Sequence, residues 1–212
     1  MNLREVLHDT LPRRPERAAR PTMTSVRSRF LRAAGTAVLA FSLVVLVNAP
    51  QCAEIAPGGR IEVAFSPNEG AEELVVRVIE SARSQIAMLA YTYTSSTVTR
   101  ALLRARSRGV AVRLVVDHRA NFEDDRTGRP ALELSALARA GCDVRVISAY
   151  LAAHDKILIA DGRTTELGSF NYSVAAARRN SENALVVWDN PDLARAYLQH
   201  FERNYRQSAA FE

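Results

Sequence analysis

The chain has 212 residues, of which 48% are hydrophobic and 24% are charged, and its formal net charge is +5. This length suits one globular domain and scarcely two, and the composition is ordinary for a folded protein. The whole net charge comes from residues 1–53, which hold eight arginines and three acids, whereas residues 54–212 hold 20 basic and 20 acidic side chains. The basic balance is therefore no indication that the folded part binds nucleic acid.

The N-terminal 53 residues have the layout of a secretory signal peptide. An apolar run at residues 33–47 follows three arginines and precedes small residues up to Ala53. The run is short for a membrane span, which needs about 20 apolar residues. We predict a leader over residues 1–53, cleavage after Ala53, and a periplasmic or secreted protein. An uncleaved helix that anchors the protein in the membrane is the alternative, and Met23 is an alternative start.

Residues 54–212 alternate between strand and helix patterns. A capping box at residues 66–69, with Pro67 at the first helical position, predicts a helix with one apolar face. Further helices are expected from Ser96 up to Gly109, over residues 131–140 and after Asn190, and residues 121–128 form a polar loop. Strands are expected at residues 61–65, 86–93, 110–116, 144–147, 156–160, 164–167 and 184–188. The pattern predicts one α/β domain, with a mixed β-sheet flanked by helices on both faces.

A hairpin is predicted around Asp161 and Gly162. These two residues separate two apolar runs, and a tight two-residue turn requires the positive φ that they adopt readily. With such a turn, His154 lies opposite Ser169 at the open end of the hairpin.

The open end of this hairpin collects polar side chains. Because side chains alternate along a strand, four of them project from one face: His154, Lys156, Ser169 and Asn171. Gly168 leaves space for the backbone to approach a bound group. An imidazole, an ammonium, a hydroxyl and an amide are a set of donors suited to a phosphate beside a nucleophile.

Lys156 also stands out in the composition of the chain. The chain contains 27 arginines and one lysine, and that lysine is Lys156. A compact ammonium with rotatable donors fits a crowded phosphate better than a guanidinium does. The composition therefore singles out this position for a functional role.

The spacing of these residues resembles a known signature. The pattern His154-x-Lys156-x4-Asp161-x6-Gly168-Ser169-x-Asn171 is similar to the complete HKD signature of the phospholipase D superfamily. Residues 60–207, which include the segment from Asn180 to Ala184, resemble the small single-motif periplasmic endonucleases of bacteria in that superfamily. This likeness covers nearly all of the predicted mature chain, 54–212, which we interpret as the catalytic domain.

The resemblance implies a role for each residue of the signature. His154 would attack phosphorus and form a phosphohistidine, while Lys156 and Asn171 hold the non-bridging oxygens. Ser169 would either contact the phosphate or pack within the hairpin. Asp161 would be a structural, ion-pairing residue. No metal and no cofactor are expected, because lysine and asparagine donors stabilise the phosphate charge.

The resemblance also implies a second copy of the chain. A second histidine must protonate the leaving oxygen, and single-motif relatives supply it across a two-fold axis. We therefore expect a homodimer with a shared site, in which Glu182 hydrogen-bonds and orients the catalytic histidine. His118 either faces this site or lies in a surface loop, and residues 178–179 either flank the cleft or form an exposed basic face.

The chemistry at phosphorus does not choose the substrate. The small single-motif architecture favours a nonspecific endonuclease acting on DNA or RNA. A phospholipase D that cuts the head-group phosphodiester of a phospholipid is the alternative. It would need a surface that meets a bilayer, and no amphipathic helix rich in lysine, arginine and tryptophan is evident.

Overall fold

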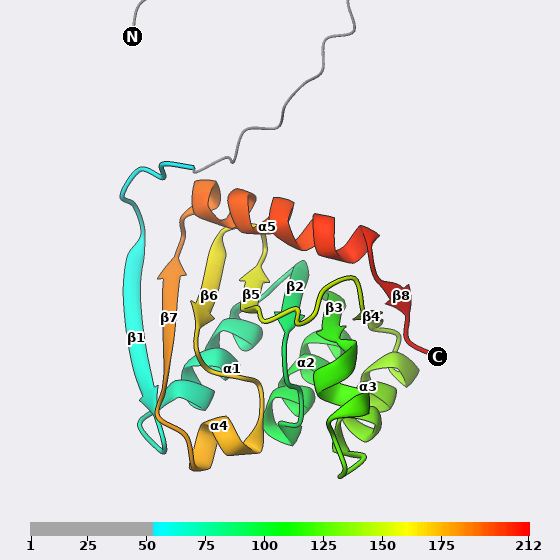
Figure 1. The fold of residues 1–212 in the computed structure, drawn as a ribbon. Coiled ribbons are helices and arrows are strands. Elements are labelled where there is room, and N and C mark those ends of the chain that lie inside the picture. Colours follow the sequence, from blue (N-terminus) through cyan, green and yellow to red (C-terminus); the bar gives the residue numbers. More distant parts are fainter. Residues whose placement is uncertain (1–52) are drawn as a thin grey trace, which may run out of the picture. The chain divides into compact units, whose positions relative to one another are not determined.

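The computed structural model describes residues 53–212. The predicted leader, its membrane-anchor alternative and the start at Met23 lie outside the described residues, except for Ala53 itself. The described part forms an eight-stranded sheet in the order β1-β7-β6-β5-β2-β3-β4-β8 (Figure 1). Strands β2, β3 and β4 are parallel, and every other neighbouring pair is antiparallel.

Strands and helices alternate along most of the chain, but β4, β5 and β6 follow one another without a helix between them. The strands are β1 (Arg60–Ser66), β2 (Gln85–Ala90), β3 (Ala111–Asp117), β4 (Asp143–Ile147), β5 (Lys156–Ala160), β6 (Thr164–Gly168), β7 (Glu182–Trp188) and β8 (Ala209–Ala210). The helices are α1 (Ala71–Ser81), α2 (Ser96–Ser107), α3 (Arg129–Arg139), α4 (Val174–Arg178) and α5 (Pro191–Arg206), with one π-helical turn, η1 (Arg119–Glu123).

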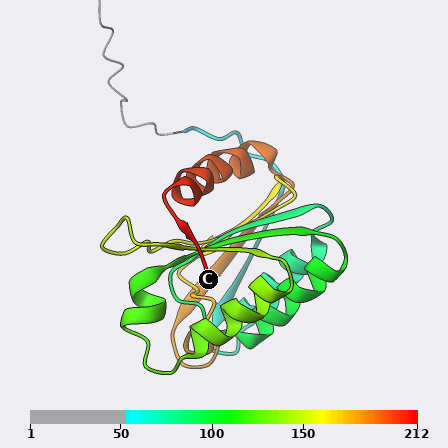
Figure 2. The same cartoon turned by 90° about the vertical axis from the view of Figure 1, so that its right-hand side faces the viewer.

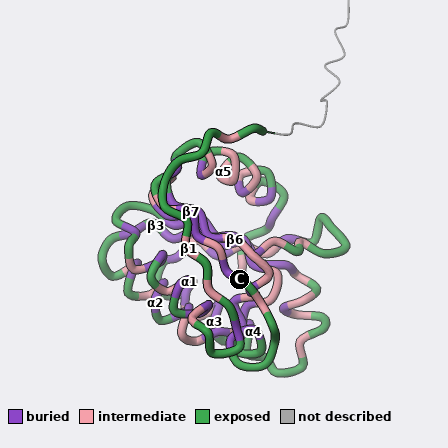
Figure 3. Tube along the Cα trace, turned by 90° about the vertical axis from the view of Figure 1, so that its left-hand side faces the viewer, coloured by how far each residue is buried: buried purple, intermediate pink, exposed green. Residues whose placement is uncertain are grey.

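Helices cover both faces of the sheet, as predicted. Helix α5 lies on one face, and α2 and α3 lie on the other (Figure 2). A large apolar core joins the sheet to α1, α2 and α3, and a smaller one joins it to α5 through Phe201. The central strands are buried between these layers, and the edge strand β1 is more exposed (Figure 3). None of the helices among residues 53–212 is long and apolar enough to cross a bilayer.

The first helix begins later than predicted. Asn68 and Gly70 both adopt positive φ, at 60° and 91°, so residues 66–70 form a turn instead of the first helical turn. Helix α1 starts at Ala71, and Pro67 lies outside it. The short elements α4 and β8 were not predicted, and part of the expected loop at residues 121–128 belongs to η1.

The hairpin β5–β6 forms, but its predicted register is wrong by one residue. Asp161 and Gly162 have the expected positive φ, at 54° and 64°. However, Ala160 pairs with Thr164, so the connection has three residues, 161–163. The extra residue shifts every cross-strand pair by one position, so Lys156 lies opposite Gly168 instead of Leu167.

One edge of the sheet gathers the segments of interest. Strand β5 runs antiparallel to β2, so Lys156 at its start pairs with Ala90 at the end of β2. On the other side, the end of β6 pairs with β7 near its start, where Gly168 lies opposite Ala184. The hairpin therefore brings the beginnings of β5 and β7 and the end of β6 to the same edge.

Candidate active site

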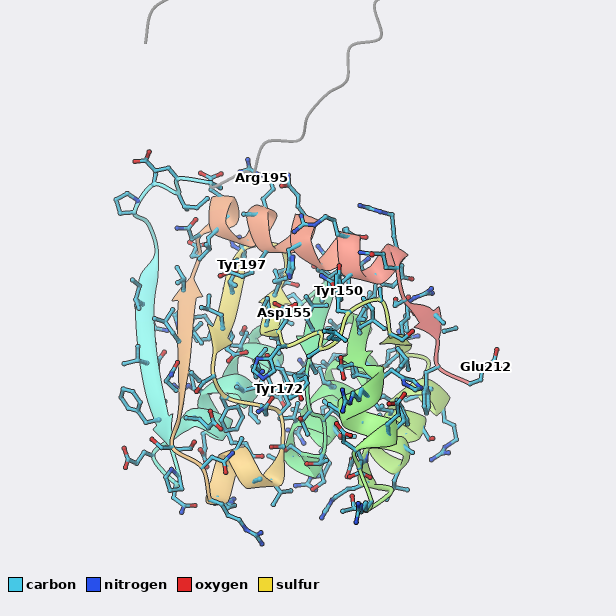
Figure 4. All side chains as sticks on the ribbon, viewed as in Figure 1. Tyr150, Asp155, Tyr172, Arg195, Tyr197 and Glu212 are labelled. Atoms are coloured by element: carbon cyan, nitrogen blue, oxygen red, sulfur yellow. The ribbon has the colours of Figure 1, made fainter. Side chains whose placement is uncertain are left out.

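A cleft of about 600 Å³ opens at this edge of the sheet. It is lined by seven residues, and six of them belong to the set predicted from the sequence: His154, Lys156, Gly168, Ser169, Asn171, Glu182 and Asn183. Asp161 lies at the other end of the hairpin. Figure 4 labels Asp155 and Tyr172, the chain neighbours of His154 and Asn171, in this part of the molecule.

His154 precedes β5 and is exposed. Hydrogen bonds fix the main chain on both sides of it, because the Ala153 amide donates to Asp117 Oδ2 at 2.7 Å and the Tyr91 amide donates to the Asp155 carbonyl at 2.9 Å. The Tyr91 ring lies against the imidazole, with ring centroids 4.3 Å apart and planes inclined by 55°. The imidazole is thus held by packing and has an open side toward the cleft.

Lys156 is the first residue of β5 and is only 5% exposed. Its ammonium donates to the His154 carbonyl at 2.8 Å and lies 4.7 Å from the centroid of the Tyr91 ring. Burial lowers the pKa of Lys156 to about 8, although the charges of Asp155 and Glu182 act to raise it. An anion bound in the cleft would restore the lost solvation and favour the ammonium form.

Gly168 has a different role from the predicted one. A Cβ atom at this position would lie 2.3 Å from the Asn183 carbonyl oxygen of β7. The close approach that Gly168 permits is therefore to the protein's own backbone and not to a bound group. The Ser169 and Phe170 amides then donate to that same carbonyl, both at 3.1 Å.

Ser169 packs within the hairpin, which is one of the two roles considered for it. Its hydroxyl oxygen accepts hydrogen bonds from the Asn183 amide at 3.0 Å and from Asn183 Nδ2 at 3.3 Å, which packs the end of the hairpin against β7. Because the oxygen is the acceptor in both bonds, the hydroxyl hydrogen stays free to point into the cleft.

Asn171 and Glu182 face the cleft from β6–α4 and from β7. Asn171 Oδ1 is buried without a hydrogen-bond partner among the described residues. Glu182 Oε1 accepts a hydrogen bond from Asn180 Nδ2 at 2.9 Å. Within the described part of a single chain, no hydrogen bond joins Glu182 to His154, so the orienting contact expected from the resemblance is not formed there.

Asp161 acts at the turn of the hairpin. Its carboxylate accepts hydrogen bonds from the amides of Arg83, Ser84 and Gln85 at 2.8, 2.8 and 3.0 Å, and from the Ser84 hydroxyl. Partial burial acts to raise the pKa of Asp161, but these hydrogen bonds outweigh it and lower the pKa below its ordinary value. Asp161 therefore attaches the turn to the loop before β2 through hydrogen bonds, and the ion pair expected for it is not formed among the described residues.

The other candidates lie outside the cleft. His118 Nδ1 is 3.1 Å from Glu123 Oε1 and borders separate hollows near Phe122, so the surface interpretation holds. Arg178 donates to Asn68 Oδ1 at 2.8 Å, and Arg179 is exposed. Across residues 53–212, no group of three or more His, Cys, Asp or Glu side chains is placed to hold a metal ion.

Two residues at the site were missed from the sequence. Tyr91 contacts both His154 and Lys156, although it reads as the end of an ordinary apolar strand. Asn183 anchors Ser169 from β7, but its place opposite the hairpin depends on a strand pairing that the sequence does not specify. Both belong to segments that carried the resemblance, which was the one available signal.

Comparison with known proteins identifies the family. Residues 75–205 match the family model described as cardiolipin synthase, PLD-like domain. A phospholipase D from Rickettsia typhi is 35% identical over 152 residues, which is 71% of this chain and 71% of that protein.

Solved structures agree with this match. Nuc from Salmonella typhimurium, described as a phospholipase D family member, has a TM-score of 0.70 and 36% identity, and the alignment covers 73% of this chain and 99% of that one. NucT from Helicobacter pylori shares the fold, with a TM-score of 0.64 at 21% identity and coverage of 73% and 100%. The chain therefore belongs to the phospholipase D superfamily and is a phosphodiesterase of that superfamily.

Proposed function

We propose that the protein is a nonspecific endonuclease that hydrolyses DNA or RNA without a metal, through a phosphohistidine, in a site shared by two copies of the chain. The observation that carries the proposal is the cleft itself. It combines the exposed His154 imidazole with the buried Lys156 ammonium and with the amide and hydroxyl of Asn171 and Ser169. These groups match what displacement at a phosphodiester requires.

The chemistry divides into two displacements at phosphorus. In the first, a His154 nitrogen forms a bond to phosphorus while the bond to the leaving oxygen breaks, and that oxygen takes a proton from a second imidazole. In the second, water gives a proton to the same imidazole and attacks phosphorus, and the nitrogen–phosphorus bond breaks. Lys156, Asn171 and the Ser169 hydroxyl hydrogen stabilise the negative oxygens in both steps.

The second imidazole has no source in the described part of the chain. Residues 53–212 contain three histidines, and of these only His154 lines the cleft. His118 pairs with Glu123, and Nε2 of His200, a residue of α5, lies 3.0 Å from Asp155 Oδ2. A second copy that brings its own His154 to the cleft supplies the missing proton donor, which supports the homodimer.

Exposed apolar side chains occur in segments next to those that line the cleft. Phe65 is 50% exposed and pairs with the cleft residue Asn183. Leu151 is 92% exposed and lies three residues before His154, and Val174 is 37% exposed and lies three residues after Asn171. Exposed apolar groups of this kind favour burial by a partner. A second copy of this chain is the occupant that would also complete the catalytic set.

A phospholipase D is the second candidate function. The relative from Rickettsia typhi carries that name. In addition, β1 carries an exposed apolar row, and only its Phe65 end pairs with the cleft residue Asn183. The row consists of Ile61, Val63 and Phe65, and a row of this kind suits a lipid surface. The same row also suits a protein partner, so it does not displace the endonuclease proposal.

The two candidates are separated by one experiment. The full chain and a His154→Ala variant are incubated in excess EDTA with plasmid DNA, with single-stranded RNA and with phosphatidylcholine vesicles. We expect the unaltered protein alone to cleave nucleic acid and to leave the vesicles intact. Head-group release without cleavage of nucleic acid would establish the phospholipase instead. Loss of every activity in EDTA would contradict the metal-independent mechanism.

We also propose that residues 1–53 direct export and that residues 54–212 are the mature catalytic domain. The basic, apolar and small segments of the leader support this proposal. N-terminal sequencing of the protein recovered from the periplasm or the medium should begin at Glu54. Recovery of the uncleaved chain in the membrane fraction would instead support the anchor.

A further inference from the structure

We propose that Tyr91 is a positioning residue of this site, whose ring holds the His154 imidazole and the Lys156 ammonium in one fixed arrangement at the cleft. The inference rests on the proposed function, because that function makes the positions of the imidazole and the ammonium important for catalysis. Tyr91 directly follows β2, so it lies beside the start of β5 at the edge that carries the cleft.

The same aromatic ring contacts both functional groups. Its centroid is 4.3 Å from that of the His154 ring and 4.7 Å from the Lys156 ammonium nitrogen. An imidazole at this separation and tilt makes an aromatic contact that restricts its rotation. A cation at this distance from a ring is attracted by its negative face. One side chain thus restrains the nucleophile and the phosphate-binding group together.

The backbone of Tyr91 is fixed on both sides. Its amide donates to the Asp155 carbonyl at 2.9 Å, and its carbonyl accepts from Asn121 Nδ2 at 2.7 Å. Asn121 is itself 2% exposed, and its side chain also donates to the Asp117 carbonyl at 2.7 Å. The ring is therefore attached to a rigid part of the sheet edge, as positioning requires.

The Tyr91 ring stabilises part of the buried charge of Lys156. It is 5% exposed, and the one hydrogen bond that its ammonium makes among the described residues is to the His154 carbonyl. No carboxylate of the described residues lies within ion-pairing distance of it. With so few partners, the face of the Tyr91 ring is a substantial part of what stabilises the buried charge.

The protein offers a direct test because Lys156 is its only lysine. The full chain labelled with ¹³C at lysine Cε gives one lysine resonance, whose pH titration reports the pKa of this ammonium without assignment and without substrate. Tyr91→Leu removes the ring but keeps an apolar side chain, and we expect it to lower that pKa by roughly half a unit to one unit. Tyr91→Phe keeps the ring and should restore the value of the unaltered protein.

Tyr197→Leu is the matched control. Tyr197 is also half-buried, but it packs on the α5 side of the sheet, away from the cleft. This variant loses a tyrosine ring of the same size and should leave the Lys156 titration unchanged. A shift of equal size in the control would attribute the effect to general loosening of the fold and would overturn the inference.

Kinetics with bis(4-nitrophenyl) phosphate complete the test. We expect Tyr91→Leu to lower kcat at least tenfold and to move the alkaline limb of its pH profile to lower pH, with both effects reversed in Tyr91→Phe. An unchanged lysine titration and pH profile in Tyr91→Leu would refute the positioning role. If the unaltered protein hydrolyses no diester while its lysine titration responds to Tyr91→Leu, the proposed function fails and the placement of Lys156 by Tyr91 stands.

Discussion

Burial of a single ammonium sets the expected pH dependence of this phosphodiesterase. Desolvation lowers the pKa of Lys156 to about 8. In the proposed mechanism the charged form holds the substrate phosphate, so phosphate affinity should be present below this value and lost as the pH rises through it. We therefore predict that kcat/KM for a diester substrate declines above about pH 8.

Lys156→Arg provides the matched variant for this prediction. A guanidinium keeps its charge throughout the measurable range. The remaining activity of Lys156→Arg should therefore show no such decline in pH profiles of kcat/KM measured from about pH 7.5 to about pH 9.5. An identical alkaline decline in both proteins would assign it to a group other than Lys156.

Gly168 gives a prediction about stability. A methyl group at residue 168 would meet the Asn183 carbonyl oxygen at 2.3 Å, so β6 and β7 would have to separate. We expect Gly168→Ala to lower the free energy of unfolding in urea by about 1–3 kcal/mol. Gly58→Ala is the control, because its added carbon meets only Asn190 Nδ2 at 3.7 Å. Equal stability of the two variants would contradict the steric argument.

At the scale of single residues, the sequence located most of the cleft. The spacing of the signature and the solitary lysine pointed to residues that line it, including Lys156 and Asn171. Tyr91 was not singled out, because a tyrosine within an apolar strand has no distinguishing local pattern and only the resemblance covered its segment. Its contacts exist only because β5 and β2 are neighbours in the sheet.

At the scale of elements, Asp161 connects the β5–β6 turn to the loop before β2. Three backbone amides and one hydroxyl donate to its carboxylate. Asp161→Asn keeps a side chain that tolerates positive φ but loses the charge, and we expect it to lower the free energy of unfolding by about 1 kcal/mol at neutral pH.

The pH dependence of this effect has a definite sign. The folded-state pKa of Asp161 is lowered, so its contribution is present above the unfolded-state pKa and is lost as the pH falls through the folded-state value. Urea unfolding of both proteins from neutral to acidic pH should therefore show their stabilities converging in acid. A constant difference at every pH would show that the charge of Asp161 contributes nothing.

The elements also show where local sequence patterns fail. Alternation of apolar residues located the strands, and the positive φ at Asp161 and Gly162 was correctly predicted. The predicted register was wrong because the turn residues indicate the backbone conformation but not the length of the connection. The connection has three residues instead of two, so Ala160 pairs with Thr164. The elements α4 and β8 are too short to show a helical or strand periodicity. The capping box at Ser66 predicted the start of a helix, but the chain forms a turn there, which the positive φ of Gly70 permits.

At the scale of the whole molecule, the mixed sheet with helices on both faces was predictable, because each layer needs its own apolar face. The sheet buries one apolar cluster against α1, α2 and α3 and another against α5. The second copy of the chain, which was expected from the resemblance alone, stays a prediction, because the structure describes a single chain. The proposed mechanism depends most on this claim of a shared site.

Mixed dimers test this claim most directly. The full chain is co-refolded from urea with an equal amount of His154→Ala, and the hydrolysis of plasmid DNA is measured per total protein. If each site needs an imidazole from both copies, only dimers of two unaltered chains are active, and the rate falls to about one quarter. Co-refolding with His118→Gln, whose side chain lies outside the cleft, should leave the rate unchanged. A rate of about one half in the His154→Ala mixture would mean that each chain works alone, which would contradict the shared site.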